Sequence, residues 1–256
     1  PNGRYVIFLS EKELFSIDLY LANARTGKII RKVASSSKDG HIDDFNYIES
    51  AGTWSPKSTQ FAYVAFSKGK NILVIKEVKS GKTIKEFPIK DVPAFSNPSW
   101  SPDGKSIVVT GLVEGRTNLY QVNIKTGRVK QLTKDAYAQI HARWSPDGST
   151  ILFSTDEWSH KNGRTHGKWT FNLAELDVAS GEITPIEIFL GADNMNALYD
   201  KHGNIYFLSN RDGFRNLYKY DVLEKKVYQM TDLITGISGI TPYAPAISLA
   251  QRIDRI

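Results

Sequence analysis

The 256-residue sequence contains no cysteine. This absence excludes disulfide bonds, thiolate metal sites and a cysteine nucleophile, and it suits a cytoplasmic and a periplasmic protein equally. No apolar run approaches the roughly 18 residues that a membrane-spanning helix needs. The net charge is only +6, whereas a dedicated nucleic-acid binder gathers its Lys and Arg on one face. We therefore expect neither a membrane span in this chain nor a nucleic-acid partner.

The usual catalytic signatures are also missing. The sequence has no G-x-S-x-G elbow, no H-E-x-x-H motif, no P-loop and no G-x-G-x-x-G loop. From these absences we assign no catalytic residue and no cofactor, and we expect a protein that is not an enzyme. The chain opens at Pro1 with neither an initiator Met nor a signal peptide, which suggests a processed or excised segment of a longer protein.

What the sequence does contain is an internal repeat. The pentapeptide Trp-Ser-Pro-Asp-Gly stands at 100–104 and again, 44 residues later, at 144–148. Trp54 begins a related Trp-Ser-Pro, and Tyr199 with Gly203 keeps the aromatic residue and the glycine of the motif. Each copy continues with two β-rich runs separated by a polar loop, then a turn and a last short run. Together with the run that leads into the aromatic residue, each unit contains four predicted strands. Short β-branched and aromatic runs punctuated by Gly and Pro indicate an all-β protein.

The motif has a structural explanation. Pro presets the turn, Asp tolerates its central position, and Gly accepts the left-handed conformation that closes a short hairpin loop. The large aromatic ring fits the role of a wedge between adjacent sheets. We therefore predict structural roles for Trp54, Trp100, Trp144, Tyr199, Gly104, Gly148 and Gly203.

Four-stranded units that cannot bury both faces alone will stack radially, which predicts a β-propeller of antiparallel blades in a single domain, 1–256. We place the repeats near 1–46, 47–92, 93–136, 137–191 and 192–238, with a partial copy at 239–256. Five blades are visible, of which four are complete. The fifth would be shared between the termini, with strands two to four from the N-terminal segment and a first strand from 241–249. Alternatively, the chain is part of a parent propeller of six or more blades.

The Trp-Ser-Pro-Asp-Gly signature, the Asn-Leu-Tyr run at 118–120 and the Leu-Thr ending at 132–133 resemble the TolB-like β-propeller repeats. The resemblance covers nearly the whole chain and implies the propeller fold. Related repeats occur in the periplasmic TolB component of the Tol–Pal system, in propellers of prolyl-oligopeptidase-like enzymes and in large envelope proteins. The resemblance therefore implies a segment of a bacterial envelope protein, in the periplasm or at the cell surface.

Three polar residues occupy one position of the repeat, three residues before the aromatic: Asn97, His141 and Asn196. This position falls on the innermost strand of each blade, which lines the central channel. The three side chains could converge there on a bound group. They could equally satisfy backbone groups and ordered water at the channel wall.

Carboxylates and an aromatic loop are the other candidate binding elements. Asp43, Asp44 and Asp193 lie in corresponding connections and should decorate one rim, where they could hold a cation or simply face solvent. The insertion at 156–170 contains Trp158 and Arg164, residue types that are frequent at interface hot spots. Its histidines also allow a metal site, and a polar hairpin loop without a ligand explains the same residues.

The leading hypothesis is a monomeric, non-catalytic scaffold that binds a protein or peptide. One alternative is the accessory propeller of a peptidase whose catalytic domain lies outside this segment. Another is a metal-dependent lyase acting on acidic sugars. That second alternative needs three or four converging metal ligands, whereas His141 is the one histidine at an inner-strand position.

Overall fold

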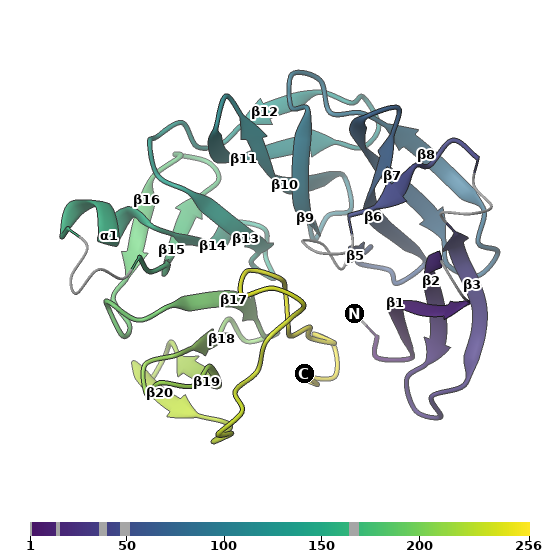
Figure 1. Ribbon diagram of the computed structural model, residues 1–256. Helices are drawn as coiled ribbons and strands as arrows, with labels where there is room; N and C mark the ends of the chain where they lie inside the picture. The colour runs from purple at the N-terminus through teal and green to yellow at the C-terminus, as the bar shows by residue number, and fades with distance from the viewer. Residues whose placement is uncertain (1, 14–15, 36–39, 47–51, 164–168) are drawn as a thin grey trace.

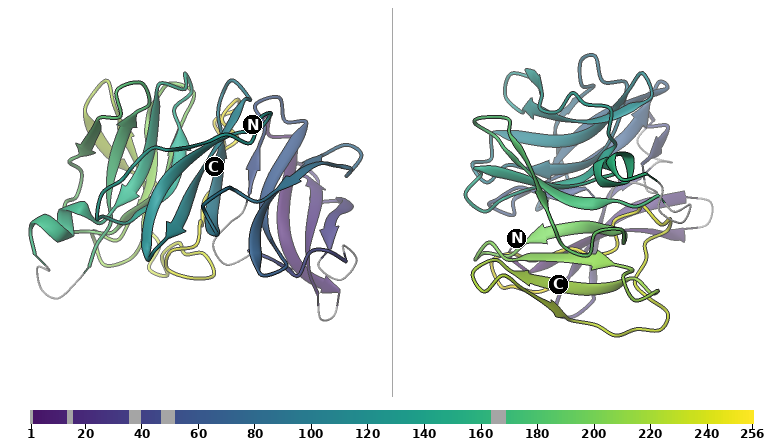
Figure 2. Two further views of the ribbon diagram at one scale, coloured as in Figure 1. Left: turned by 90° about the horizontal axis from the view of Figure 1, so that it is seen from above. Right: turned by 90° about the vertical axis from the view of Figure 1, so that its left-hand side faces the viewer.

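The chain folds as a five-bladed β-propeller with almost no helix (Figure 1). The structure, a computed structural model, describes residues 2–13, 16–35, 40–46, 52–163 and 169–256. Its five antiparallel sheets stand around a common centre, and the side views show them packed face against face (Figure 2). The predicted all-β propeller is confirmed.

The blades follow the chain in order. The first blade contains β1 (Tyr5–Glu13), β2 (Ser16–Asn23) and β3 (Ile29–Ser35). The second contains β4 (Asp44–Phe45), β5 (Thr53–Trp54), β6 (Gln60–Ser67), β7 (Lys70–Glu77) and β8 (Thr83–Phe87). The third contains β9 (Ala94–Trp100), β10 (Ser106–Val113), β11 (Arg116–Asn123) and β12 (Val129–Gln131). The fourth contains β13 (Gln139–Trp144), β14 (Thr150–Thr155), β15 (Asn172–Asp177) and β16 (Ile183–Ile186). The fifth contains β17 (Asn194–Tyr199), β18 (Ile205–Ser209), β19 (Asn216–Asp221) and β20 (Lys226–Gln229).

The Ser-Pro-Asp-Gly turn links the first two strands of a blade. In the fourth blade the Asp147 carboxylate accepts hydrogen bonds from the Ser145 hydroxyl at 2.6 Å and from the Ser149 backbone N–H at 3.0 Å. These bonds stabilise the charged carboxylate and lower the pKa of Asp147 to about 2. Gly148 has a φ of +78°, a conformation that glycine adopts without steric cost.

The hydrophobic core lies between the blades, and the motif aromatics sit in it. Trp100 belongs to a cluster that joins Val64 and Leu73 of the second blade to Ile107 of the third. Trp144 and Tyr199 occupy the same place in the next two interfaces, and Trp54 packs at the edge of the first. Each aromatic ring therefore contacts its own blade and the one before it.

The blade at the N-terminus differs from the expectation. It has three strands, and β1 is an edge strand, because no strand from the C-terminal segment pairs with it among the described residues. Residues 241–249 form no strand, and one isolated bridge, Ala250 to Arg255, follows them. The C-terminal end instead packs its Ile253 side chain so close to Gly3 that a side chain on Gly3 would collide with it. Arg252 also donates to the Pro56 carbonyl of the second blade at 3.0 Å.

The insertion of the fourth blade also differs from a plain hairpin loop. It contains the short helix α1 (Glu157–Lys161), at the outer side of the molecule in Figure 1. Lys161 pairs with Glu157 one helical turn away, at 2.6 Å. Within the described ranges, no helix has the length and apolarity needed to cross a membrane.

Candidate functional site

The innermost strands of three blades share an irregularity at the predicted channel position. Asn97, His141 and Asn196 have φ values of +50°, +59° and +57°, and the pairing of each innermost strand with its neighbour shifts register there. Asparagine tolerates this left-handed conformation better than most residues, whereas for histidine it is less common. All three side chains are buried. The bulge therefore redirects three polar side chains from the sheet towards neighbouring parts of the chain.

His141 joins the fourth blade to two other segments. Its Nδ1 accepts the backbone N–H of Asn196 at 3.3 Å, and its Nε2 lies 2.8 Å from the carbonyl oxygen of Tyr243. Because an N–H can only donate and a carbonyl can only accept, the ring is neutral, with its proton on Nε2. Burial lowers the pKa of His141 to about 4, which agrees with this neutral form.

Asn196 makes the matching contact in the fifth blade. Its Oδ1 accepts two backbone N–H groups, from Ala246 at 2.6 Å and from Ile247 at 3.0 Å. Arg215 adds a hydrogen bond to the Pro242 carbonyl at 2.6 Å. We call residues 241–249 the channel segment, since they run past the centre of the propeller beside β17 (Figure 1). Polar side chains thus hold its main chain at both carbonyl and N–H groups.

Asn97 stands at the same position in the third blade but differs in its contacts. Its Nδ2 donates to Ser96 Oγ at 3.1 Å, and its buried Oδ1 has no hydrogen-bond partner among the described residues. The three predicted channel residues therefore do not converge on one point. Two of them bind main-chain groups, and the third offers an unused acceptor.

A second set of asparagines was present in the sequence as the start of the Asn-Leu-Tyr run, but no role was predicted for it. These buried residues begin the third strands and are Asn71, Asn118, Asn172 and Asn216. Asn71 Nδ2 donates to the carbonyl of Phe95, on the innermost strand of the next blade, and Asn172 Nδ2 donates to the carbonyl of Ala192, in the connection to the next blade. Their recurrence was a usable signal, because a buried amide at one repeat position must find partners.

The rim carboxylates do not come together as one site. Asp43 accepts the Gly69 N–H at 3.3 Å, and Asp44 accepts the adjacent Phe45 N–H at 2.7 Å. Asp193, in the connection before the fifth blade, accepts the Phe171 N–H at 3.0 Å. Asp43 and Asp193 thus bind main-chain N–H groups of other segments, and Asp44 binds that of its neighbour. Within the described residues no group of three or more His, Asp or Glu could hold a metal ion.

The insertion presents an aromatic surface. His160 lies between Tyr137 and Trp169, with ring centroids 5.3 and 4.6 Å away, and Trp169 Nε1 donates to the buried Asp156 at 2.9 Å. The half-buried Trp158 lies against Gly191. Arg164, the other predicted contact residue here, falls outside the described residues.

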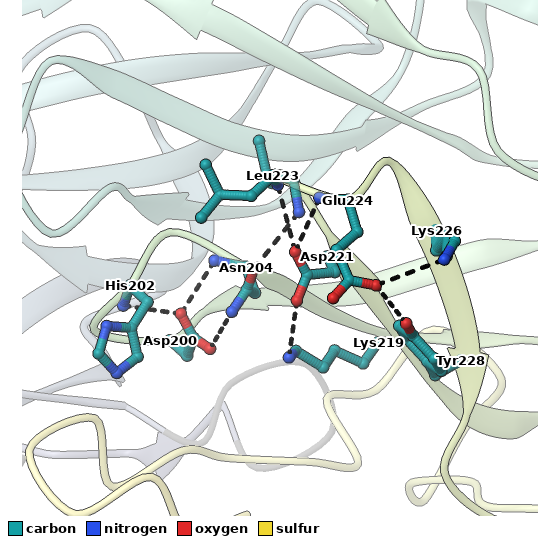
Figure 3. A network of polar contacts seen from close by, with 10 residues as sticks. Asp200, His202, Asn204, Lys219, Asp221, Leu223, Glu224, Lys226 and Tyr228 are labelled. Carbon is teal, nitrogen blue, oxygen red and sulfur yellow. Dashed lines mark hydrogen bonds and ion pairs between the residues drawn. The ribbon is translucent and has the colours of Figure 1, made fainter.

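In two turns of the fifth blade, polar side chains are hydrogen-bonded or ion-paired to neighbouring residues (Figure 3). Asp200 accepts the backbone N–H groups of His202 and Asn204 at 2.8 and 2.9 Å. In the next turn, Asp221 pairs with Lys219 at 3.2 Å and accepts two backbone N–H groups. The network stabilises the turns, and His202 enters it through its main chain.

The geometry agrees with what this chain resembles. Residues 42–166 match the family model described as the TolB beta propeller domain. Together with the TolB relatives described below, this match to just under half of the chain supports a TolB-like β-propeller repeat family. The Tol-Pal system protein TolB of Francisella tularensis subsp. tularensis (strain WY96-3418) is 28% identical over 224 residues, which cover 84% of this chain and 46% of that protein.

Solved structures support the same TolB-like fold. TolB from Acinetobacter baumannii is similar with a TM-score of 0.66 at 23% identity, over 89% of this chain and 52% of that one. The β-propeller domain of the Trilobed protease from Pyrococcus furiosus is similar with a TM-score of 0.60 at 18% identity, over 91% of this chain and 67% of that one. These likenesses show the fold alone. The chain spans about half the length of the Francisella and Acinetobacter TolB proteins.

Proposed function

We propose that this TolB-like propeller is a non-catalytic scaffold that binds a protein or peptide partner in the bacterial cell envelope, in the periplasm or at the cell surface. The family relationship supports the envelope setting, since the similar Francisella protein belongs to the Tol-Pal system. We further propose that the chain acts as a monomer. Sedimentation equilibrium would test that part independently of any partner.

The proposal rests on the hydrogen bonds between side chains of the inner strands and the main chain of the channel segment. His141 binds a carbonyl oxygen, and Asn196 binds two N–H groups, all of them main-chain atoms. Contacts of this kind suit any extended polypeptide, because they do not depend on its side chains. The channel wall therefore has the chemistry that peptide recognition requires.

The same contacts argue against a catalytic role for these groups. A general base needs a free lone pair within reach of substrate. The Nδ1 lone pair of His141 is already hydrogen-bonded, and its Nε2 proton is donated. The groups at the channel wall are thus engaged in binding and positioning.

Asn97 provides the most direct test, because its Oδ1 accepts no hydrogen bond from any residue that the structure describes. We expect the chain to bind one of the other proteins of a Tol–Pal system with a dissociation constant on the order of micromolar. Asn97→Ala should weaken that binding about 5–10-fold, the effect of one buried hydrogen bond. Surface plasmon resonance with purified Tol–Pal proteins would measure both quantities.

Gln131→Ala is the matched control. Gln131 is an exposed amide on the outer strand of the same blade as Asn97, outside the candidate binding elements. Equal weakening by the two substitutions would contradict a channel site. Failure of every Tol–Pal protein to bind the unmodified chain would contradict the proposed function.

A further inference from the structure

A cleft separates the second and third blades where their hairpins end. Its volume is about 440 Å³, within the range of roughly 300–1,000 Å³ that is typical of ligand sites. Phe45 and Phe66 line it from the second blade, and Phe95 and Leu112 line it from the third. The cleft is distinct from the channel segment, whose contacts are with the fourth and fifth blades.

One repeat position distinguishes this cleft from the corresponding places in the later blades. Phe95 stands two residues before Asn97, where the next two blades have Gln139 and Asn194. Gln139 is hydrogen-bonded to Thr133 at 2.6 Å, and Asn194 donates to the Ile188 carbonyl at 2.9 Å. At this position the later interfaces therefore have polar side chains that bond within the protein. The second interface instead has the buried ring of Phe95, and its polar contact there is the hydrogen bond from Asn71 to the Phe95 carbonyl.

One buried polar group in the cleft is unused. Thr110 and Leu112 lie on the same side of β10, two residues apart, and both line the cleft. Thr110 is 4% exposed, and its Oγ1 has no hydrogen-bond partner among the described residues. A buried hydroxyl without a partner carries a desolvation cost, so a ligand that bonds to it gains affinity. Leu112, at 44% exposed, presents apolar surface at the same cleft.

An aromatic ring with a hydroxyl group fits these features. Aromatic rings pack favourably against other rings, edge to face or offset. The Thr110 hydroxyl can donate to a phenol oxygen or accept from it. The other lining residues are neutral apart from Asp44, and their amides and hydroxyls suit the amide groups of a peptide.

We propose that this cleft binds a tyrosine side chain of the partner polypeptide, in contact with Phe45, Phe66 and Phe95 and hydrogen-bonded to Thr110. The inference rests on the proposed function, because it supplies the chemistry of the partner. It adds a second point of attachment, away from the channel.

N-acetyl-tyrosinamide and N-acetyl-phenylalaninamide are the probes, since they differ by the hydroxyl alone. Ligand-observed NMR titration of the 256-residue chain should give an affinity for the tyrosine amide about 5-fold higher than for the phenylalanine amide. Thr110→Val, which keeps the shape and removes the hydroxyl, should abolish this preference. Thr184→Val, an exposed threonine on the outer strand of the fourth blade, should leave it unchanged.

If the Thr110→Val variant does not fold, the Leu112→Trp variant tests the same cleft. Because Leu112 is partly exposed, the larger ring should be tolerated, and it should obstruct the cleft and remove binding of both amides. Equal affinity of the two amides for the unmodified chain, or no binding of either, would overturn the proposal. Binding of p-cresol without binding of the tyrosine amide would overturn the assignment to a polypeptide.

The test of the tyrosine cleft and the test of the proposed function can give opposite results. A Tol–Pal protein that binds while the tyrosine amide does not would refute the tyrosine cleft and leave the scaffold function standing. A tyrosine amide that binds in a Thr110-dependent way, with no Tol–Pal protein binding, would refute the proposed function alone.

Discussion

Replacing Trp144 by alanine tests whether the repeat aromatics hold neighbouring blades together. The indole is 8% exposed, and it shares one cluster with Val108 of the third blade and Ile151 of its own. Its Nε1 donates to the Ser99 carbonyl in the preceding blade at 3.2 Å. Loss of a buried Trp side chain costs about 3–5 kcal/mol, and the unpaired carbonyl adds about 1 kcal/mol. We expect the free energy of unfolding to fall by about 4–6 kcal/mol.

Trp54 is the internal comparison, because it holds the same repeat position but is only half-buried. We expect Trp54→Ala to cost about 1–3 kcal/mol, in keeping with its smaller burial. Urea unfolding followed by circular dichroism measures both values, and the Trp144 change should lower Tm by roughly 8–24 °C. An equal cost for the two substitutions, or a cost below about 1 kcal/mol for Trp144→Ala, would refute the wedge interpretation.

Two further predictions concern the channel and the turns. The pKa of His141 is about 4 in the folded chain and about 6.5 when unfolded, so the unfolded chain takes up the proton first as pH falls. Stability should therefore decrease by up to roughly 3 kcal/mol as pH falls from about 6.5 to 4, and urea unfolding of His141→Gln should show a weaker pH dependence. Gly148→Ala should cost about 1–2 kcal/mol at its left-handed φ, whereas Gly40→Ala, in open space without such a φ, should stay within about 0.5 kcal/mol by the same assay.

The repeat determined most of what could be predicted from sequence. Asp147 and Gly148 form a turn whose contacts are all within a few residues, and Trp144 packs in the interface between two blades. The motif alone was therefore enough to predict the turn and the interface. The position of His141 on an inner strand also followed from its spacing to Trp144.

Contacts between residues far apart in the chain could not be predicted from the repeat motif. The predicted first strand at 241–249 has suitable residues, but its main-chain groups bond to side chains of the fourth and fifth blades, so no ladder forms. The cleft arises because Phe95 replaces a polar residue found at the same position in other blades, and its consequence depends on the opposing Phe45 and Phe66. The asparagines of the third strands were visible as a motif, but the partners of Asn71 and Asn172 lie about 20 or more residues further along the chain, on or just before the next blade.

The central claim is that the channel wall holds polypeptide main chain through a neutral His141. A long-range ¹H–¹⁵N NMR spectrum of the histidine rings at neutral pH tests it most directly. We predict that His141 shows a protonated Nε2 and an unprotonated, hydrogen-bonded Nδ1. A spectrum in which His141 is positively charged, or carries its proton on Nδ1, would contradict the account.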